Sequence, residues 1–208
     1  MNAIYLHGFA SGSGSKKGRY FAERFAAHGI LLHTPDLVPD FESITLSGQL
    51  GVVEAVGAGR PIDLLIGSSM GGYLAALYAA RRPKQVRRVV CLAPAFDFAN
   101  RWALRQGEEG MALWRETGKL PVFHYGIGRE ARVGYELYTD SQRFEPFPAV
   151  ANPILIAHGL RDDVVPIDLS REFARRTLHA ELREFDSDHE LIDVLPKLWE
   201  AVWAFSQS

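Results

Sequence analysis

The sequence predicts an α/β protein with a doubly wound sheet of about six mostly parallel strands. Short aliphatic or β-branched runs alternate with longer amphipathic segments, as in chains built from repeated strand–helix units. Most of the short runs are apolar at successive positions, which is typical of parallel strands buried on both faces. The 208 residues suffice for one hydrophobic core and do not require two, so we expect a single domain over residues 1–208.

Six short runs are the expected strands. In chain order they are Ala3–His7, Ile30–His33, Asp63–Gly67, Arg88–Ala93, Ile154–His158 and Glu181–Phe185. The last run lies in "AELREF", where apolar and polar residues alternate. Because alternation indicates a strand with one solvated face, we expect this strand at an edge of the sheet.

Five amphipathic segments between the runs are the expected helices. In chain order they are Lys16–His28, Ser43–Val56, Met70–Arg82, Asp168–Arg176 and Leu191–Phe205. The first is followed by Gly29 and the third by Pro83, and both residue types commonly end helices.

Residues 96–149 interrupt the alternation of strands and helices. This segment contains Trp102 and Trp114, and it has helix-like pieces at Arg101–Arg115 and Glu130–Asp140. An insertion of this length between two strands is usually a functional loop system. We therefore expect a helical, lid-like insertion before the penultimate strand.

Composition excludes several classes of partner. The 23 basic and 25 acidic side chains nearly cancel, so the chain lacks the positive charge that drives nucleic-acid binding. No stretch approaches the roughly 20 apolar residues needed to cross a bilayer, and the N-terminal apolar run is too short for a signal peptide. We expect no nucleic-acid or membrane partner and a cytoplasmic location.

The chain also lacks the sequence patterns of common metal and nucleotide sites. Its one cysteine, Cys91, lies in an apolar stretch and is interpreted as core. No metal-ligand spacing is present, and "GSGSKKG" does not match the glycine patterns that bind phosphate. We therefore expect neither a metal nor a cofactor.

The segment "GSSMGG" places Ser69 where an expected strand turns into an expected helix. Gly67, Ser69 and Gly71 fit the pattern G-x-S-x-G, in which a sharp turn lifts a serine hydroxyl above the sheet. A glycine- and serine-rich turn without chemistry has the same composition, so the pattern alone leaves both interpretations open. Ser68 is the competing serine, but it lacks glycines two positions away on both sides.

A serine nucleophile needs a base and a carboxylate that orients the base. The loop after the strand in "PILIAH" contains Asp162 and Asp163, and the loop after the next strand contains His189. Loops at the carboxyl ends of parallel strands share one crevice, so these residues can meet Ser69. The residues alone leave the choice between the two aspartates open.

Two backbone amides are candidates for an oxyanion hole. Met70 directly follows the candidate nucleophile, and Phe9 lies in a loop after the first expected strand, next to Gly8. These are the two places from which a strand–serine–helix turn of this kind draws its amide donors.

Together these motifs resemble the α/β-hydrolase superfamily, and in particular the small bacterial YqiA-like esterases. The shared elements are, in order, Tyr5–Phe9, Ser11–Lys16, Gly67–Tyr73, His158–Pro166 and Asp188-His189. They cover essentially the whole chain except the insertion. The sequence departs from the family in two places: Ala10 stands where asparagine is frequent, and "DSDHEL" lacks the glycines that often precede the histidine.

The resemblance implies an α/β-hydrolase fold and a serine hydrolase that acts on small-molecule carboxylic esters. It implies a catalytic triad of Ser69, Asp162 and His189, since the family's aspartate is the fourth residue after the histidine of "HGxxD". The amides of Phe9 and Met70 would then form the oxyanion hole. A thioesterase, a serine peptidase and a non-catalytic binding protein on the same fold stay open, as does the oligomeric state.

Two further histidines and several aromatic residues can have structural roles as well as functional ones. His7 and His158 each precede a glycine at a strand end, where we expect them to bond nearby backbone. The side chains that could line an acyl pocket could equally form the core of the insertion. They are Phe9, Met70, Trp102, Trp114, Phe123 and Tyr125.

Overall fold

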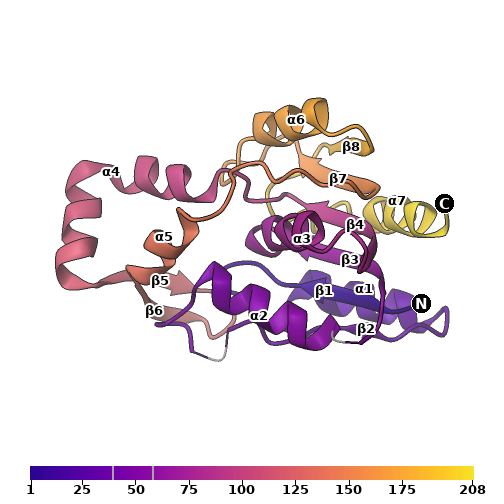
Figure 1. Cartoon of the computed structure of the whole chain (residues 1–208), viewed down its shortest axis with the longest axis horizontal. Coiled ribbons are helices and arrows are strands. Elements are labelled where there is room, and N and C mark those ends of the chain that lie inside the picture. The colour runs from indigo at the N-terminus through magenta and orange to yellow at the C-terminus, as the bar shows by residue number, and fades with distance from the viewer. Residues whose placement is uncertain (39, 58) are drawn as a thin grey trace.

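The central sheet has six strands, and every neighbouring pair runs parallel. The computed structural model describes residues 1–38, 40–57 and 59–208. The strands lie in the order β2-β1-β3-β4-β7-β8 (Figure 1). Their bounds are β1 Ala3–Leu6, β2 Leu32–His33, β3 Ile62–Ser68, β4 Val86–Leu92, β7 Ile154–Gly159 and β8 Ala180–Phe185. All six expected strands are confirmed, and β8 is an edge strand as expected.

The strand order reverses between β1 and β3, which is where parallel sheets form their ligand crevice. After β1 the chain adds β2 on one side and then crosses over to add β3 on the other. In the pairing of β1 with β3, Leu6 lies opposite Gly67. The residues that follow these two therefore leave the sheet side by side.

Helices cover both faces of the sheet because its strands are apolar on both sides. Ile4 and Leu6 of β1 belong to one buried cluster with residues of α2 (Leu46–Gly57), α3 (Met70–Arg81) and α6 (Ile167–Arg176), while Ala3 and Tyr5 belong to a second cluster with residues of α1 and α7 on the other face. The bounds of these last two are Lys16–Ala26 and Leu195–Gln207.

Helix α7 begins later than the sequence pattern predicted. The expected start at Leu191 is wrong, because Leu191 has φ 56° and lies in the left-handed region, where a right-handed helix cannot begin. Pro196 occupies the first turn of α7 instead, a position that suits the fixed φ of proline.

The insertion between β4 and β7 is only partly helical. It consists of α4 (Phe98–Thr117), an antiparallel hairpin of β5 (Lys119–His124) and β6 (Arg129–Gly134), and α5 (Glu136–Ser141). It forms the left end of the molecule in Figure 1, away from both termini. The expected helical piece at Arg101–Arg115 lies within α4, whereas the hairpin was not expected.

The expected helix over 130–140 splits at Gly134 into strand β6 and helix α5. A Cβ on Gly134 would lie 2.6 Å from the carbonyl oxygen of Glu42, and the Gly134 N–H donates to that oxygen. This contact with a distant loop and the pairing with β5 override the local helical tendency. Within α4, Gly107 has φ 66° and bends the helix.

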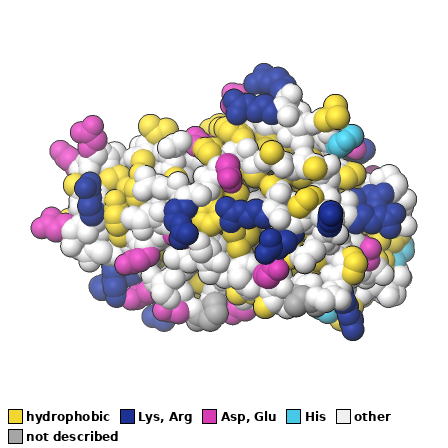
Figure 2. All heavy atoms as spheres, in the orientation of Figure 1, with side chains coloured by type: hydrophobic (Ala, Val, Ile, Leu, Met, Phe, Trp, Pro, Cys, Tyr) yellow, Lys and Arg dark blue, Asp and Glu magenta, His cyan; other side chains and the backbone are white. Residues whose placement is uncertain are grey.

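In the described ranges, no helix has the length and apolar character needed to cross a membrane. Figure 2 shows hydrophobic side chains interspersed with charged ones on this face, and Lys and Arg gathered at the top of the view, where Figure 1 places α6. On and near that helix, Arg171 pairs with Glu184 and Arg176 pairs with Glu172 at the surface.

Candidate active site

Ser69 sits alone between β3 and α3 in a strained conformation. Its φ is 55° and its ψ is −119°, a combination that is unfavourable for a residue with a Cβ. The surrounding backbone holds it there: the Ser69 N–H donates to Leu92 O at 2.8 Å, and the Ser69 carbonyl accepts from Gly72 N at 2.9 Å and Ala95 N at 3.0 Å. The turn therefore fixes where the serine hydroxyl points.

The glycines of the motif allow backbone segments to pass in contact. A Cβ on Gly67 would lie 2.0 Å from the carbonyl oxygen of Gly71, and a Cβ on Gly71 would lie 2.3 Å from the carbonyl oxygen of Leu6. Rigid backbone cannot yield at such distances, so the G-x-S-x-G spacing has a steric cause here.

We predict that Gly67→Ala lowers the free energy of unfolding by about 3 kcal/mol or more, because β3 and α3 must separate to admit the methyl group. The matched control is Gly51→Ala, in exposed helix, where a Cβ would meet no atom within 4 Å. That control should be stabilised by up to about 1 kcal/mol. Chemical denaturation measures both, and equal stabilities would contradict the steric argument.

Two hydrogen bonds join Ser69, His189 and Asp162. The Ser69 hydroxyl lies 3.1 Å from His189 Nε2, and His189 Nδ1 lies 2.7 Å from Asp162 Oδ2. The three loops that carry them follow β3, β8 and β7. The structure thus brings together the three side chains that the sequence proposed, whereas Asp163 is exposed beside them.

The side chain of Asp162 is completely buried, and both of its carboxylate oxygens accept hydrogen bonds. Its Oδ1 accepts from the amides of Val164 and Val165 at 2.9 and 2.8 Å, and His158 Nε2 lies 3.0 Å from its Oδ2. Burial alone would raise the pKa of Asp162. The hydrogen bonds from His158 and His189 outweigh burial and hold that pKa well below its usual range, so the carboxylate is ionised.

His158 and His7 form hydrogen bonds with nearby backbone groups, as expected, and His158 also contacts the Asp162 carboxylate. His158 Nε2 also lies 2.9 Å from Val165 O, and its Nδ1 accepts from the Ser170 hydroxyl at 2.7 Å. The contact of His158 with Asp162 was missed at the sequence level. The sequence feature that could have indicated it is the spacing of four residues between His158 and Asp162 in "HGLRD", because a tight turn over this length brings the carboxylate back to the imidazole.

His7 fixes the start of the loop that follows β1. Its Nδ1–H donates to Gly8 O at 3.0 Å, and its Nε2 accepts from Leu37 N at 3.3 Å. Burial lowers the pKa of His7, so the ring stays neutral and can accept at Nε2.

The loop after β1 passes directly over the nucleophile. A Cβ on Gly8 would lie 3.3 Å from Ser69 Cβ and 3.9 Å from its Oγ. Phe9 follows in this loop, and Met70 begins α3, so its amide belongs to the helix N-terminal groups without an intrahelical acceptor. Ala10 has φ 52°, which explains why asparagine, the residue most tolerant of this region after glycine, suits the position.

Ser68, the competing serine, is the last residue of β3 and does not lie in the turn. It is buried near the phenol of Tyr5. Burial raises the pKa of Tyr5 to about 12, so the phenol stays protonated. Ser68 is thus buried at the end of β3, whereas the Ser69 hydroxyl lies within hydrogen-bonding distance of His189.

Aromatic side chains connect the β1 loop to the insertion. Phe9 packs against Phe41 and edge-on against Trp102, with ring centroids 5.2 and 5.4 Å apart. Trp114 is buried and donates to Val133 O, as expected of core in the insertion. By contrast, Phe123 and Tyr125 pack on each other at the surface, 54% and 73% exposed, so the core interpretation of that pair was wrong.

Cys91 is core, as expected. It is buried, its thiol donates to Gly72 O, and burial raises its pKa. Across the part of the chain that the structure describes, no three His, Cys, Asp or Glu side chains gather in a way that could hold a metal ion.

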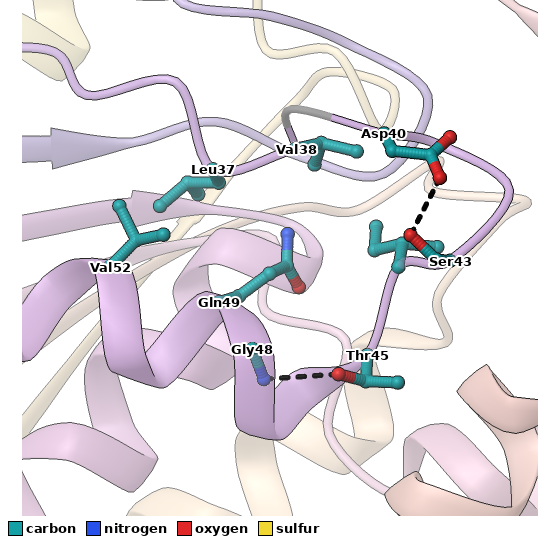
Figure 3. Close-up of a pocket in the computed structure, with 9 residues that line it drawn as sticks. Leu37, Val38, Asp40, Ser43, Thr45, Gly48, Gln49 and Val52 are labelled. Carbon is teal, nitrogen blue, oxygen red and sulfur yellow. Dashed lines mark hydrogen bonds between the residues drawn. The ribbon is translucent and has the colours of Figure 1, made fainter.

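A separate cavity of about 240 Å³ lies between α2 and the loop that precedes it. Figure 3 shows Gln49 of α2 pointing towards Leu37 and Val38, while Thr45 caps the start of the helix by accepting from Gly48 N. None of the five predicted site residues lines this cavity.

A family model described as "Uncharacterised protein family (UPF0227)" matches residues 2–207. The chain belongs to this family. The match confirms the membership that the ordered motifs indicated, and it extends through the insertion that the motifs did not cover.

Solved structures show the fold of this family member. Alpha/beta hydrolase domain-containing protein 10 from mouse superposes with a TM-score of 0.79 at 19% identity, covering 97% of this chain and 88% of that one. Est1E from Butyrivibrio proteoclasticus gives 0.79 at 23% identity, covering 98% and 85%. The chain therefore has the α/β-hydrolase fold.

Among relatives in sequence, the human palmitoyl-protein thioesterase ABHD10, mitochondrial, is 29% identical over 143 residues. The matched region is 62% of this chain, and it spans only 44% of the length of that relative.

Proposed function

We propose that this protein is a serine hydrolase that cleaves carboxylic esters of small molecules through an acyl-enzyme. The observation that carries this proposal is the pair of hydrogen bonds linking Ser69, His189 and Asp162. A serine hydroxyl becomes a nucleophile when an imidazole can accept its proton, and the imidazole needs a carboxylate to fix its tautomer.

In the proposed mechanism, Ser69 Oγ attacks the ester carbonyl carbon while His189 Nε2 takes the hydroxyl proton. His189 then returns this proton to the leaving alcohol, and the acyl group stays on Ser69. Water attacks the acyl-enzyme in the same way, with His189 as the base, and releases the acid. Asp162 accepts from Nδ1–H throughout and stabilises the imidazolium, a role that its lowered pKa supports.

The negative charge on the tetrahedral intermediate needs donors close to Ser69. We assign this role to the amides of Met70, at the start of α3, and Phe9, in the loop that crosses above Ser69. Two fixed donors in a site that excludes water stabilise an oxyanion more than mobile water does.

We further propose that the chain is one domain over 1–208 whose insertion, 96–149, covers the substrate. The insertion contacts both sides of the site: Arg101 donates to Val164 O in the Asp162 loop, and Gly126 N donates to Ala10 O in the Phe9 loop. The aromatic contact of Phe9 with Trp102 favours an apolar or aromatic acyl group.

Thioester hydrolysis is the second candidate, because the human relative is named a thioesterase and the same residues serve any acyl transfer. Est1E, by contrast, has been solved with ferulic acid bound, an aromatic acid. Neither name refers to cleavage of a peptide bond, so peptides have the least support among the candidate substrates.

The test is a panel of oxygen esters, thioesters and amides that share the same acyl groups. We expect oxygen esters to be cleaved and matched amides to be cleaved at least about 100-fold more slowly. A kcat/KM for thioesters at least 10-fold above that for the matched oxygen esters would favour the second candidate instead. Hydrolysis of none of these substrates by the folded protein would contradict the proposal.

A further inference from the structure

Lys17 contacts the loop of His189 from the opposite end of the chain. It lies in the first turn of α1, and its Nζ donates to the carbonyl oxygen of Glu190 at 2.6 Å. Glu190 directly follows His189. The side chain is partly buried, whereas its neighbour Lys16 is exposed.

Three carboxylates attract the Lys17 ammonium: those of Glu190 and Asp188 on either side of His189, and that of Asp162, which bonds the imidazole. Burial lowers the pKa of Lys17 to about 8, and the attraction of these carboxylates opposes that shift. Arg19, on the same helix, is bound to Gly14 O. Lys17 is therefore charged at neutral pH and loses its charge as the pH rises through about 8.

The loop that Lys17 contacts is also held at Leu191, which is buried in the core, and at Asp193, which pairs with Arg161. Asp188 Oδ1 accepts from the amides of Glu190 and Leu191 at 2.9 and 3.3 Å, and the strained φ of Leu191 turns the chain towards α7. These bonds are local to the loop. The bond from Lys17 ties it to α1, a helix packed against the sheet.

We propose that Lys17 is a positioning residue that holds the Glu190 carbonyl and thereby keeps the His189 imidazole between Asp162 and Ser69. This inference rests on the proposed function. Small displacements of a catalytic base are costly, because proton transfer requires the base within hydrogen-bonding reach of the hydroxyl.

The test compares Lys17→Met and Lys17→Arg with the matched control Lys16→Met, using an ester that the wild type hydrolyses and that Ser69→Ala does not. At pH 7 we expect Lys17→Met to lower kcat about 10- to 100-fold with KM changed less than about twofold and the melting temperature retained. Lys17→Arg should keep most of the activity, and Lys16→Met all of it.

The pH profile supplies a readout that a merely structural lysine would not move. The wild-type kcat should fall as the pH rises through about 8, where Lys17 becomes neutral. Lys17→Arg should lack this fall, because a guanidinium stays charged. Lys17→Leu, which like methionine has neither a donor nor a charge, provides a second variant should the methionine variant unfold.

A Lys17→Met or Lys17→Leu variant with wild-type kcat, or with only KM changed, would overturn the inference and leave the proposed function standing. An unchanged alkaline fall in Lys17→Arg would also overturn it. If the wild-type protein showed no hydrolysis that is lost in Ser69→Ala, both the proposed function and this inference would be overturned.

Discussion

Replacing Ser69 with alanine is expected to lower kcat for ester hydrolysis about 10⁶-fold, which is the loss seen when comparable nucleophiles are removed. The fold should stay intact, because the turn is held by backbone bonds from Ser69 N and O and not by the hydroxyl. Initial rates with a chromogenic ester, together with circular dichroism, measure both effects. Turnover above about 1% of wild type would contradict the role assigned to Ser69.

A second substitution at this position separates chemistry from strain. Ser69→Gly should be as inactive as Ser69→Ala, but more stable than the alanine variant by about 1 kcal/mol, because glycine adopts a φ of 55° without a steric penalty. Denaturant midpoints measure the difference. Equal stability of the two variants would mean that the conformation of Ser69 stores no strain.

Replacing Asp162 with asparagine should lower kcat about 10⁴-fold, the size of effect that follows when a triad aspartate loses its charge and the wrong imidazole tautomer is favoured. The effect should be the same from pH 5 to pH 7. The hydrogen bonds of Asp162 keep its pKa below the ordinary value of 3.8, so the native carboxylate is ionised throughout this range.

The neighbouring Asp163 is the matched control for Asp162. It is exposed, so Asp163→Asn should retain wild-type kcat and stability. If Asp163→Asn lost activity while Asp162→Asn kept it, the orienting carboxylate would have been assigned to the wrong residue.

The sequence predicted the sheet well because each of its strands has a pattern that can be recognised from neighbouring residues alone. Buried parallel strands are apolar at successive positions, and this holds for β3 and β7, which are intermediate or buried at every residue. The hairpin β5–β6 was missed for the opposite reason. The residues of β5 alternate in exposure and most of those of β6 are not buried. The strand conformation of each depends on the other and on Glu42, about ninety residues away from Gly134.

The candidate site could be predicted in its outline because its side chains follow strand ends in one crevice. The sequence identified Ser69 and His189 directly, and it left two adjacent candidates, Asp162 and Asp163, for the orienting carboxylate. It did not reveal the contacts of Lys17 with Glu190 O or of His158 with Asp162. The former joins segments 173 residues apart, and no local pattern encodes such a bond.

The most direct measurement of the central claim is covalent labelling with a fluorophosphonate, followed by intact mass and peptide mapping. Such a reagent modifies a serine only where a base activates the hydroxyl. The structure leads us to expect one adduct, on Ser69, that forms rapidly in the wild type and is lost in Ser69→Ala and strongly slowed in His189→Ala. An unlabelled wild-type protein, or an adduct that persists in Ser69→Ala, would contradict the claim that Ser69 is the activated nucleophile.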